Sequence, residues 1–378
     1  MVAAPGFGVR CRLACRGCRK IGEDQPLNKP ATIYDIAKKL DVSAATVSRV
    51  LSNSKYPVRA ELAKRIREAA DALNYVPNSI GRQLKTNKTS TMGVIIPSIT
   101  NPFYASVVSG IEEVASERGY QILLCNSQHD PELEDQHLNM LFEKQVRGVV
   151  LSSVSNKRET LRKVMANGLK VISIDQHLAD FEAFQINFDY RKGGRIGTRH
   201  LLDQGHRDIA YLTAPLTLTS RQQILQGYLD EMASAGLQVP QARIVIAEKR
   251  RGKKREDGSE EFENGKRMTR QLIESGDMPT AIFACNDMTA FGVLNELASH
   301  GIQVPDQISV IGFDNLEFTE IVSPRLTSIE QPKYEMGRLA CGMLMDWMND
   351  AAGQTGEIML QPRLVERSSV GGASSVLR

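Results

Sequence analysis

The sequence lacks the features that mark membrane proteins, secreted proteins and several large classes of enzyme. It has no apolar run of the length, about 18 residues, that a helix needs to cross a membrane. Residues 1–29 contain no apolar segment of the kind that directs secretion. No P-loop, no Gly-x-Ser-x-Gly elbow and no His-Glu-x-x-His motif occurs, and the 6 histidines form no cluster. We therefore predict a cytoplasmic protein without a membrane span, a cofactor or a catalytic site.

Cysteine is also scarce, with 6 residues in 378. Three of them have the spacing Cys-x3-Cys-x2-Cys, which invites a metal site, but no fourth Cys or His lies nearby to complete a tetrahedral shell. We favour a disordered leader over residues 1–29 and no metal. The other three lie in apolar runs and are expected to be buried thiols in a reducing compartment. The six are Cys11, Cys15, Cys18, Cys125, Cys285 and Cys341.

The charge is distributed unevenly along the chain. The whole sequence carries +3, but residues 1–29 carry +4 and residues 30–89 carry +6, which leaves −7 for residues 90–378. A small basic region joined to a large acidic one indicates that the basic end meets phosphate, although basic surfaces are often merely solvated.

The stretch Ala31–Val50 has the pattern of two short helices joined by a tight turn. Apolar residues recur at helical spacing in its first half, and Thr32 stands where a helix N-cap belongs. Turn chemistry at Asp41–Ser43 follows, and a second helix begins there with Val47 and Val50 predicted to face inward. This is the layout of a DNA-binding helix-turn-helix, although an ordinary helical hairpin has the same pattern.

From residue 91 onward, short β-rich runs alternate with helical ones, which predicts an α/β fold of parallel sheets covered by helices on both faces. Two such units in tandem would form two lobes with a cleft at the carboxyl ends of their strands. The charged stretch 249–263 is expected to be a loop. The expected strands are 92–97, 120–126, 148–152, 171–175, 209–213, 243–247, 281–285 and 309–313, and the expected helices are 58–73, 103–118, 131–144, 158–167, 193–204, 220–235, 265–274 and 288–299.

Three motifs in the first third of the chain resemble successive signatures of the lactose-repressor (LacI/GalR) family of bacterial transcription regulators. They are ATIYDIAKKLDVSAATVSRVLS, ALNYVPNSIGRQLKTNKT and MGVIIPSITNPFY. The resemblance implies an N-terminal three-helix helix-turn-helix head, a hinge helix and a two-lobed core like that of periplasmic binding proteins. The implied boundaries are 30–76 for the head, 77–90 for the hinge and 91–370 for the core, with lobe 1 over 91–187 plus 333–360 and lobe 2 over 188–329.

The resemblance also implies which residues contact DNA. Arg49 on the recognition helix suits the edge of a guanine, Ala44 and Ala45 offer only apolar contact, and Leu84 would wedge between base pairs in the minor groove. For each Ser and Thr, a helix cap or a solvated hydroxyl is an equally good interpretation. The predicted DNA-binding residues are Thr32, Tyr34, Ser43, Ala44, Ala45, Thr46, Ser48, Arg49, Asn53, Asn78 and Leu84.

A second set of matching positions is expected to bind a small-molecule effector in the cleft. An arginine usual in the family is replaced by Ile224, and Arg221 lies nearby, which would suit a sugar acid or a sugar phosphate as well as a sugar. Turn or cap roles are the alternative for Asp287 and Asp314. The predicted effector-binding residues are Phe103, Tyr104, Asp175, Arg221, Asn286, Asp314 and Gln331.

Taken together, these features predict a homodimeric repressor of a carbohydrate-utilisation operon. Two heads would bind the half-sites of a pseudo-palindromic operator in double-stranded DNA, and a sugar-like effector would change the affinity. The alternative is a global regulator whose affinity is set by a protein co-effector docked on the core. No coiled-coil tail is expected after Trp347, because Gly353, Pro362 and Gly371 interrupt the heptads.

Overall fold

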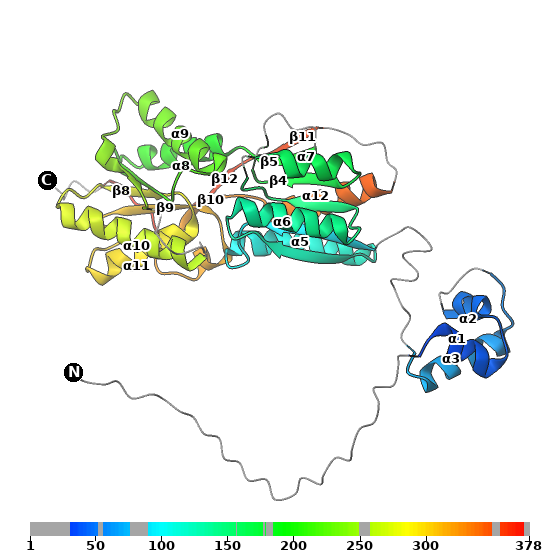
Figure 1. Cartoon of the computed structure of the whole chain (residues 1–378). Coiled ribbons are helices and arrows are strands. Elements are labelled where there is room, and N and C mark those ends of the chain that lie inside the picture. The colour runs from blue at the N-terminus through cyan, green and yellow to red at the C-terminus, as the bar shows by residue number, and fades with distance from the viewer. Residues whose placement is uncertain are drawn as a thin grey trace, which may run out of the picture. The chain divides into compact units, whose positions relative to one another are not determined.

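The computed structural model describes residues 31–51, 56–75, 90–155, 157–176, 178, 184–248, 258–349 and 356–373, in two separate units that divide after Lys88 (Figure 1). The expected leader over 1–29, the hinge at 77–90 except for Ser90, and the predicted DNA contacts Asn53, Asn78 and Leu84 lie outside the described residues.

The N-terminal unit is a three-helix head made of α1 (Ile33–Leu40), α2 (Ala44–Leu51) and α3 (Ala60–Ala72). Thr32 precedes α1 as its N-cap, as the sequence predicts, and Asp41 ends that helix in the left-handed conformation at φ 52°. Val47 and Val50 point inward from α2, as expected, and pack with side chains of α1 and α3. Ala45 and Arg49 are the exposed residues of α2, on the side away from this cluster.

The C-terminal unit contains two six-stranded sheets, each with helices on both faces, as the alternation predicts. In lobe 1, Val94 packs on one face with α5 and α12, and the next residue, Ile95, packs on the other with α6 and α7. The strand order is β11-β5-β4-β3-β1-β2, all parallel. Its elements are β1 (Thr91–Ile96), α5 (Pro102–Glu117), β2 (Gln121–Asn126), α6 (Pro131–Glu143), β3 (Gly148–Leu151), α7 (Glu159–Ala166), β4 (Lys170–Ile174), β5 (Phe184–Phe188), α12 (Lys333–Met348) and β11 (Glu357–Leu360).

Lobe 2 repeats this plan with the order β12-β10-β9-β8-β6-β7, in which β12 alone is antiparallel to its neighbour. The α8–α9 pair covers one face of the sheet and the α10–α11 pair covers the other. Its elements are α8 (Tyr190–Asp203), β6 (Ile209–Thr213), α9 (Thr219–Ser234), β7 (Ile244–Ile246), α10 (Gly258–Ser275), β8 (Ala281–Ala284), α11 (Asp287–Ser299), β9 (Ser309–Asp314), β10 (Thr327–Glu330) and β12 (Arg363–Val365), with the short 3-10 helices Gln241–Arg243 and Glu317–Glu320.

The structure corrects the expected elements at several places. The loop expected over 249–263 is wrong in its second half, because α10 already begins at Gly258. Glu260 and Glu261 occupy the first turn of that helix, where negative charge is favourable. The α8 helix begins at Tyr190 because Asp189 accepts a hydrogen bond from the backbone of Lys192 at 2.9 Å. The elements β5, β10, α12, β11 and β12 were not expected.

The chain crosses between the two lobes three times. The crossings are Asp189, Gln331–Pro332 and Gln361–Pro362, each only one or two residues long. The backbone N–H of Asp189 donates to the carbonyl of Leu360 at 3.0 Å, and the hydroxyl of Tyr190 donates to the side chain of Gln331 at 3.2 Å. The three crossings therefore lie side by side. In Figure 1, α12 accordingly lies among the elements of lobe 1 although it comes late in the chain.

Candidate DNA-binding surface and effector cleft

The exposed side of α2 carries small polar side chains and one cation. Ala45 and Arg49 are exposed, and Ala44, Thr46 and Ser48 are half-buried. Ser43 acts as a cap: its hydroxyl accepts from the backbone N–H of Thr46 at 3.1 Å and lies 2.9 Å from the hydroxyl of that residue. Arg49 is therefore the one long side chain that α2 presents.

The start of α1 supplies a second part of the head surface. Tyr34 is 71% exposed there, which leaves its ring and hydroxyl accessible to a partner. The backbone N–H and the hydroxyl of Thr32 both donate to the Asp35 carboxylate, at 2.8 and 2.7 Å, and these bonds lower the pKa of Asp35. Thr32 thus serves the fold of α1, the alternative that the sequence left open for such residues.

Tyr56 is a surface residue that sequence reasoning missed. Its ring lies beneath the guanidinium of Arg49, with 4.4 Å between the guanidinium carbon and the ring centre. The signal in the sequence is an aromatic residue directly before a proline, Pro57, which nothing local links to Arg49.

In the core, all seven predicted effector-binding residues line one cleft between the lobes, with a cavity volume of about 60 Å³. They come together because each lies near the carboxyl end of a strand or at the start of a helix, and the two sheets face each other with these ends. Phe103 and Tyr104 supply an aromatic wall, with ring centres 5.0 Å apart in an edge-to-face arrangement.

On the lobe 1 side of the cleft, Asp175 is the centre of a dense hydrogen-bond network. It directly follows β4 and has a left-handed backbone, with φ at 67°. Its carboxylate accepts from Tyr104 at 3.0 Å, from Ser152 at 3.2 Å and from Gln176 at 3.0 Å, and it also accepts from the hydroxyl of Tyr190. Burial, strengthened by the charge of Asp175, raises the pKa of both tyrosines, so their hydroxyls stay protonated donors.

On the lobe 2 side, Asp314 ends β9 and accepts from Gln331 at 2.7 Å. Burial, together with the neighbouring charges of Asp287 and Glu261, raises its pKa well above the ordinary value. Burial also raises the pKa of Asp287 to about 7. The Asp287 carboxylate accepts from the backbone of Leu316 at 2.7 Å and the hydroxyl of Ser328 at 2.6 Å, so it holds the turn that follows β9.

Arg221 has its own partners within the chain. Its guanidinium pairs with the Glu261 carboxylate at 3.2 Å and donates to the carbonyl of Pro215 at 3.2 Å. Arg221 and Glu261 are both almost fully buried. A carboxylate of the protein therefore lies directly beside the guanidinium of Arg221.

Hydrogen bonds cross the cleft directly. The amide of Asn101 in lobe 1 donates to Glu261 in lobe 2 at 3.1 Å, and the amide of Gln176 donates to Ser220 at 3.0 Å. These four residues and Tyr190 line the cleft and were missed from the sequence. Asn101 was missed because it is the N-cap of α5, which already accounts for its side chain. Glu261 was missed because it lies in the charged stretch that was expected to be a loop.

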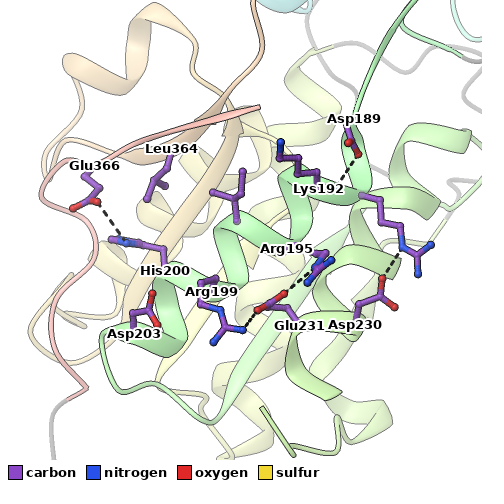
Figure 2. A pocket seen from close by; sticks show the side chains of 12 residues that line it. Asp189, Lys192, Arg195, Arg199, His200, Asp203, Asp230, Glu231, Leu364 and Glu366 are labelled. Carbon is purple, nitrogen blue, oxygen red and sulfur yellow. Dashed lines mark hydrogen bonds and ion pairs between the residues drawn. The ribbon is translucent and has the colours of Figure 1, made fainter. Parts of the chain in front are cut away.

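A larger hollow of about 850 Å³ lies on lobe 2 over α8 and α9 (Figure 2). Its cations are matched by acids: Arg191 pairs with Asp230 at 2.6 Å, and both Arg195 and Arg199 pair with Glu231. It shares no lining residue with the effector cleft, and we interpret it as a network of surface ion pairs.

No described helix is long and apolar enough to cross a membrane. Within the same residues, no group of three or more His, Cys, Asp or Glu side chains is arranged to hold a metal ion.

Comparison with known proteins identifies the family. Residues 32–78 match the model of bacterial regulatory proteins of the lacI family, and residues 198–370 match a periplasmic binding protein-like domain. The ribose operon repressor of Escherichia coli (strain K12) is 35% identical over 90% of this chain and 99% of its own length. The transcriptional repressor PurR of Pasteurella multocida is 32% identical over 90% of this chain and 98% of its own length.

Solved structures agree with this result. A structure of the lac repressor dimer bound to operator and the anti-inducer ONPF is similar, with a TM-score of 0.78 at 25% identity over 91% of this chain and 100% of that one. A LacI family regulator from Enterococcus faecium with bound ribose has a TM-score of 0.67 at 25% identity over 75% of this chain and 100% of that one. The chain therefore belongs to the lacI family of bacterial regulatory proteins, as a DNA-binding transcriptional repressor with a helix-turn-helix head and a two-lobed core.

Proposed function

We propose that this repressor controls a carbohydrate-utilisation operon in the cytoplasm, and that a small neutral sugar in the inter-lobe cleft sets its affinity for a pseudo-palindromic operator. The observation that carries the proposal is the convergence of all seven predicted effector residues on one cleft with walls from both lobes. A ligand that contacts both lobes stabilises one relative arrangement of them, which is what effector control requires.

The charge of the cleft favours a neutral polyol over a sugar acid or a sugar phosphate. Asp314 offers an acceptor for ligand hydroxyls, and Asn286 and Gln331 add amide groups. Among the described residues that line the cleft, Arg221 supplies the one guanidinium, and Glu261 lies 3.2 Å from it, so an added anion would approach a carboxylate. The names of two relatives, a ribose operon repressor and a regulator solved with ribose, support pentoses as the first ligands to test.

Exposed apolar side chains support the proposed homodimer. Leu123 and Leu124 point to solvent from β2, the edge strand of the first sheet, and Phe318 and Ile321 are exposed in lobe 2. Exposed apolar groups on a sheet edge are a liability that soluble proteins normally cover. We propose that a second copy of the chain covers them, which would also bring two heads to two operator half-sites.

The proposal is tested by ligand-dependent melting followed by DNA binding. The purified full-length protein is heated with ribose, other pentoses and hexoses, ribose 5-phosphate, sugar acids and purines, and each ligand that raises Tm is tested for its effect on operator affinity. We expect a neutral sugar to raise Tm and change the affinity. If anionic ligands act instead, the proposed ligand class is wrong. If no small molecule acts, the alternative of a protein co-effector on the core replaces the sugar.

A further inference from the structure

The one long side chain on the exposed side of α2 rests on an aromatic ring. The guanidinium of Arg49 lies 4.4 Å from the centre of the Tyr56 ring, well within the ~6 Å over which a cation is attracted to a ring face. Tyr56 is 61% exposed, and it does not belong to the apolar cluster that holds the three helices of the head together. The ring therefore contributes little to the core of the head, and it contacts the guanidinium of Arg49 instead.

Tyr56 is also well suited to hold a fixed position. It precedes Pro57, and the residue before a proline is restricted to extended backbone conformations. A tyrosine side chain has few rotatable bonds, whereas an exposed arginine has many and loses that freedom when it binds. Stacking on a restricted ring removes part of this entropy loss before any DNA is present.

We propose that Tyr56 is a positioning residue for DNA reading: it holds the Arg49 guanidinium in the orientation that donates two hydrogen bonds to one guanine. A guanidinium above a ring can present its face to the ring and its edge to a guanine, so the contact with Tyr56 is compatible with a bidentate contact to the base. The inference rests on the proposed operator binding through α2 and adds a residue that lies outside that helix.

The composition of α2 makes this contact important. Ala44 and Ala45 are too short to donate hydrogen bonds to a base, and Arg49 is the only charged residue of the helix. Base recognition through hydrogen bonds therefore falls mainly on Arg49, and its orientation determines how sharply a guanine is preferred over other bases.

The test begins by selecting operators. Full-length wild-type protein is used to enrich sequences from a library of randomised duplexes, and the enriched sequence then serves as the probe for Tyr56→Ala, Tyr56→Phe, Arg49→Ala and the double variant Tyr56→Ala/Arg49→Ala. For Tyr56→Ala we expect affinity for the selected operator to fall about 5- to 30-fold, because the stack is lost in both half-sites of a dimer. The preference for guanine at one position of each half-site falls with it, and Tyr56→Phe stays within about twofold of wild type.

The controls separate positioning from other roles. In the Arg49→Ala background, adding Tyr56→Ala has no further effect if the two residues act as a unit. Affinity for a scrambled duplex stays unchanged, since it depends on phosphate contacts elsewhere, and this also shows that the head remains folded. Equal losses in Tyr56→Ala and Tyr56→Phe would instead assign the effect to the hydroxyl, and additive losses would show independent action. Either result overturns the inference while leaving operator binding intact. A wild-type protein that enriches no sequence overturns both.

Discussion

The two lobes have the same strand order, and each places an aspartate at the equivalent point of the cleft, but the two carboxyl groups are held very differently. Asp175 follows β4 and Asp314 ends β9, the corresponding strand, and both have a positive φ, at 67° and 112°. Asp175 accepts hydrogen bonds from four side chains of both lobes. Among the described residues, Gln331 is the side-chain donor to Asp314, which lies near the charges of Asp287 and Glu261.

The same arrangement of strands therefore places a carboxylate saturated with hydrogen-bond donors in lobe 1 and a carboxyl group with few donors in lobe 2. Left-handed backbone at a residue other than glycine is strained and persists where the surroundings fix it. The strain at Asp175 is offset by a complete set of donors. The Asp314 carboxyl instead retains capacity to accept from a ligand, and its raised pKa makes its charge depend on what binds beside it.

The largest effect is expected from removing the acceptor of lobe 1. Asp175→Ala removes the one carboxylate that accepts from the buried side chains of Tyr104, Ser152, Gln176 and Tyr190, so we expect the free energy of unfolding of the core to fall by about 3–5 kcal/mol. Asp314→Ala, the matched change in lobe 2, removes the acceptor of one side-chain bond, from Gln331, and should lower it by about 1 kcal/mol. Denaturant titration of both variants measures the difference. Equal losses would show that the two aspartates are equivalent after all.

A smaller loss is expected from Glu261→Gln, which leaves the buried Arg221 without its counter-charge. We expect about 2–3 kcal/mol of destabilisation. The ligand preference should move toward ribose 5-phosphate and other anions, because the guanidinium becomes available to them. Asp230→Asn, which disrupts the exposed pair with Arg191, should change neither stability nor ligand preference measurably. If Glu261→Gln still responds only to neutral sugars, Arg221 does not set the ligand class.

The pH dependence of stability should change when Asp287 in lobe 2 is replaced. Because folding raises the pKa of Asp287 to about 7, the folded protein holds this proton more tightly than the unfolded chain. The stability gained in this way is complete below about pH 4 and is lost as pH rises to about 7. Between pH 5 and 7 we expect the free energy of unfolding of Asp287→Asn to gain about 1–2 kcal/mol relative to wild type.

The prediction is made for the difference between Asp287→Asn and wild type. Burial lowers the pKa of His200 and His206, so these two histidines make the free energy of unfolding rise with pH, opposite to the effect of Asp287. The relative stability is obtained by denaturant titration at several pH values. A difference between Asp287→Asn and wild type that does not change with pH would show that Asp287 is already ionised in the folded protein at pH 5.

The smallest effect is expected at a contact between the lobes. Ser220→Ala removes the acceptor of the bond from Gln176, and Gln176 keeps its bond to Asp175. We expect a loss of about 0.5–1 kcal/mol in stability and a change of at most a few fold in sugar affinity. Isothermal titration with the sugar found in the melting screen measures the second quantity. A loss as large as that of Asp175→Ala would mean that this contact, and not the aspartate, holds the lobes together.

The sequence predicts the positions along each sheet better than the contacts between sheets. The seven effector residues could be named because they match positions of the family, and each also follows a strand or begins a helix, where parallel sheets gather ligand contacts. The partners across the cleft could not, because nothing local links Asn101 to Glu261 or Gln176 to Ser220. The strand β5 was missed for a related reason: Gln185 and Asn187 make it look half-exposed, although all its residues are buried. The amide of Gln185 is satisfied by the backbone of Leu178, at 2.8 and 3.0 Å.

The three adjacent crossings between the lobes have a mechanical consequence. Three short, adjacent segments between two bodies resist sliding and twisting, so rotation about the line of the crossings is the movement that they oppose least. Pro332 and Pro362 stiffen two of the three segments, since proline fixes its own φ. Under the proposed effector control, ligands of different chemistry would all move the lobes by this rotation. The ligand class could then change through the cleft side chains while the three crossings, and with them the movement, stay the same.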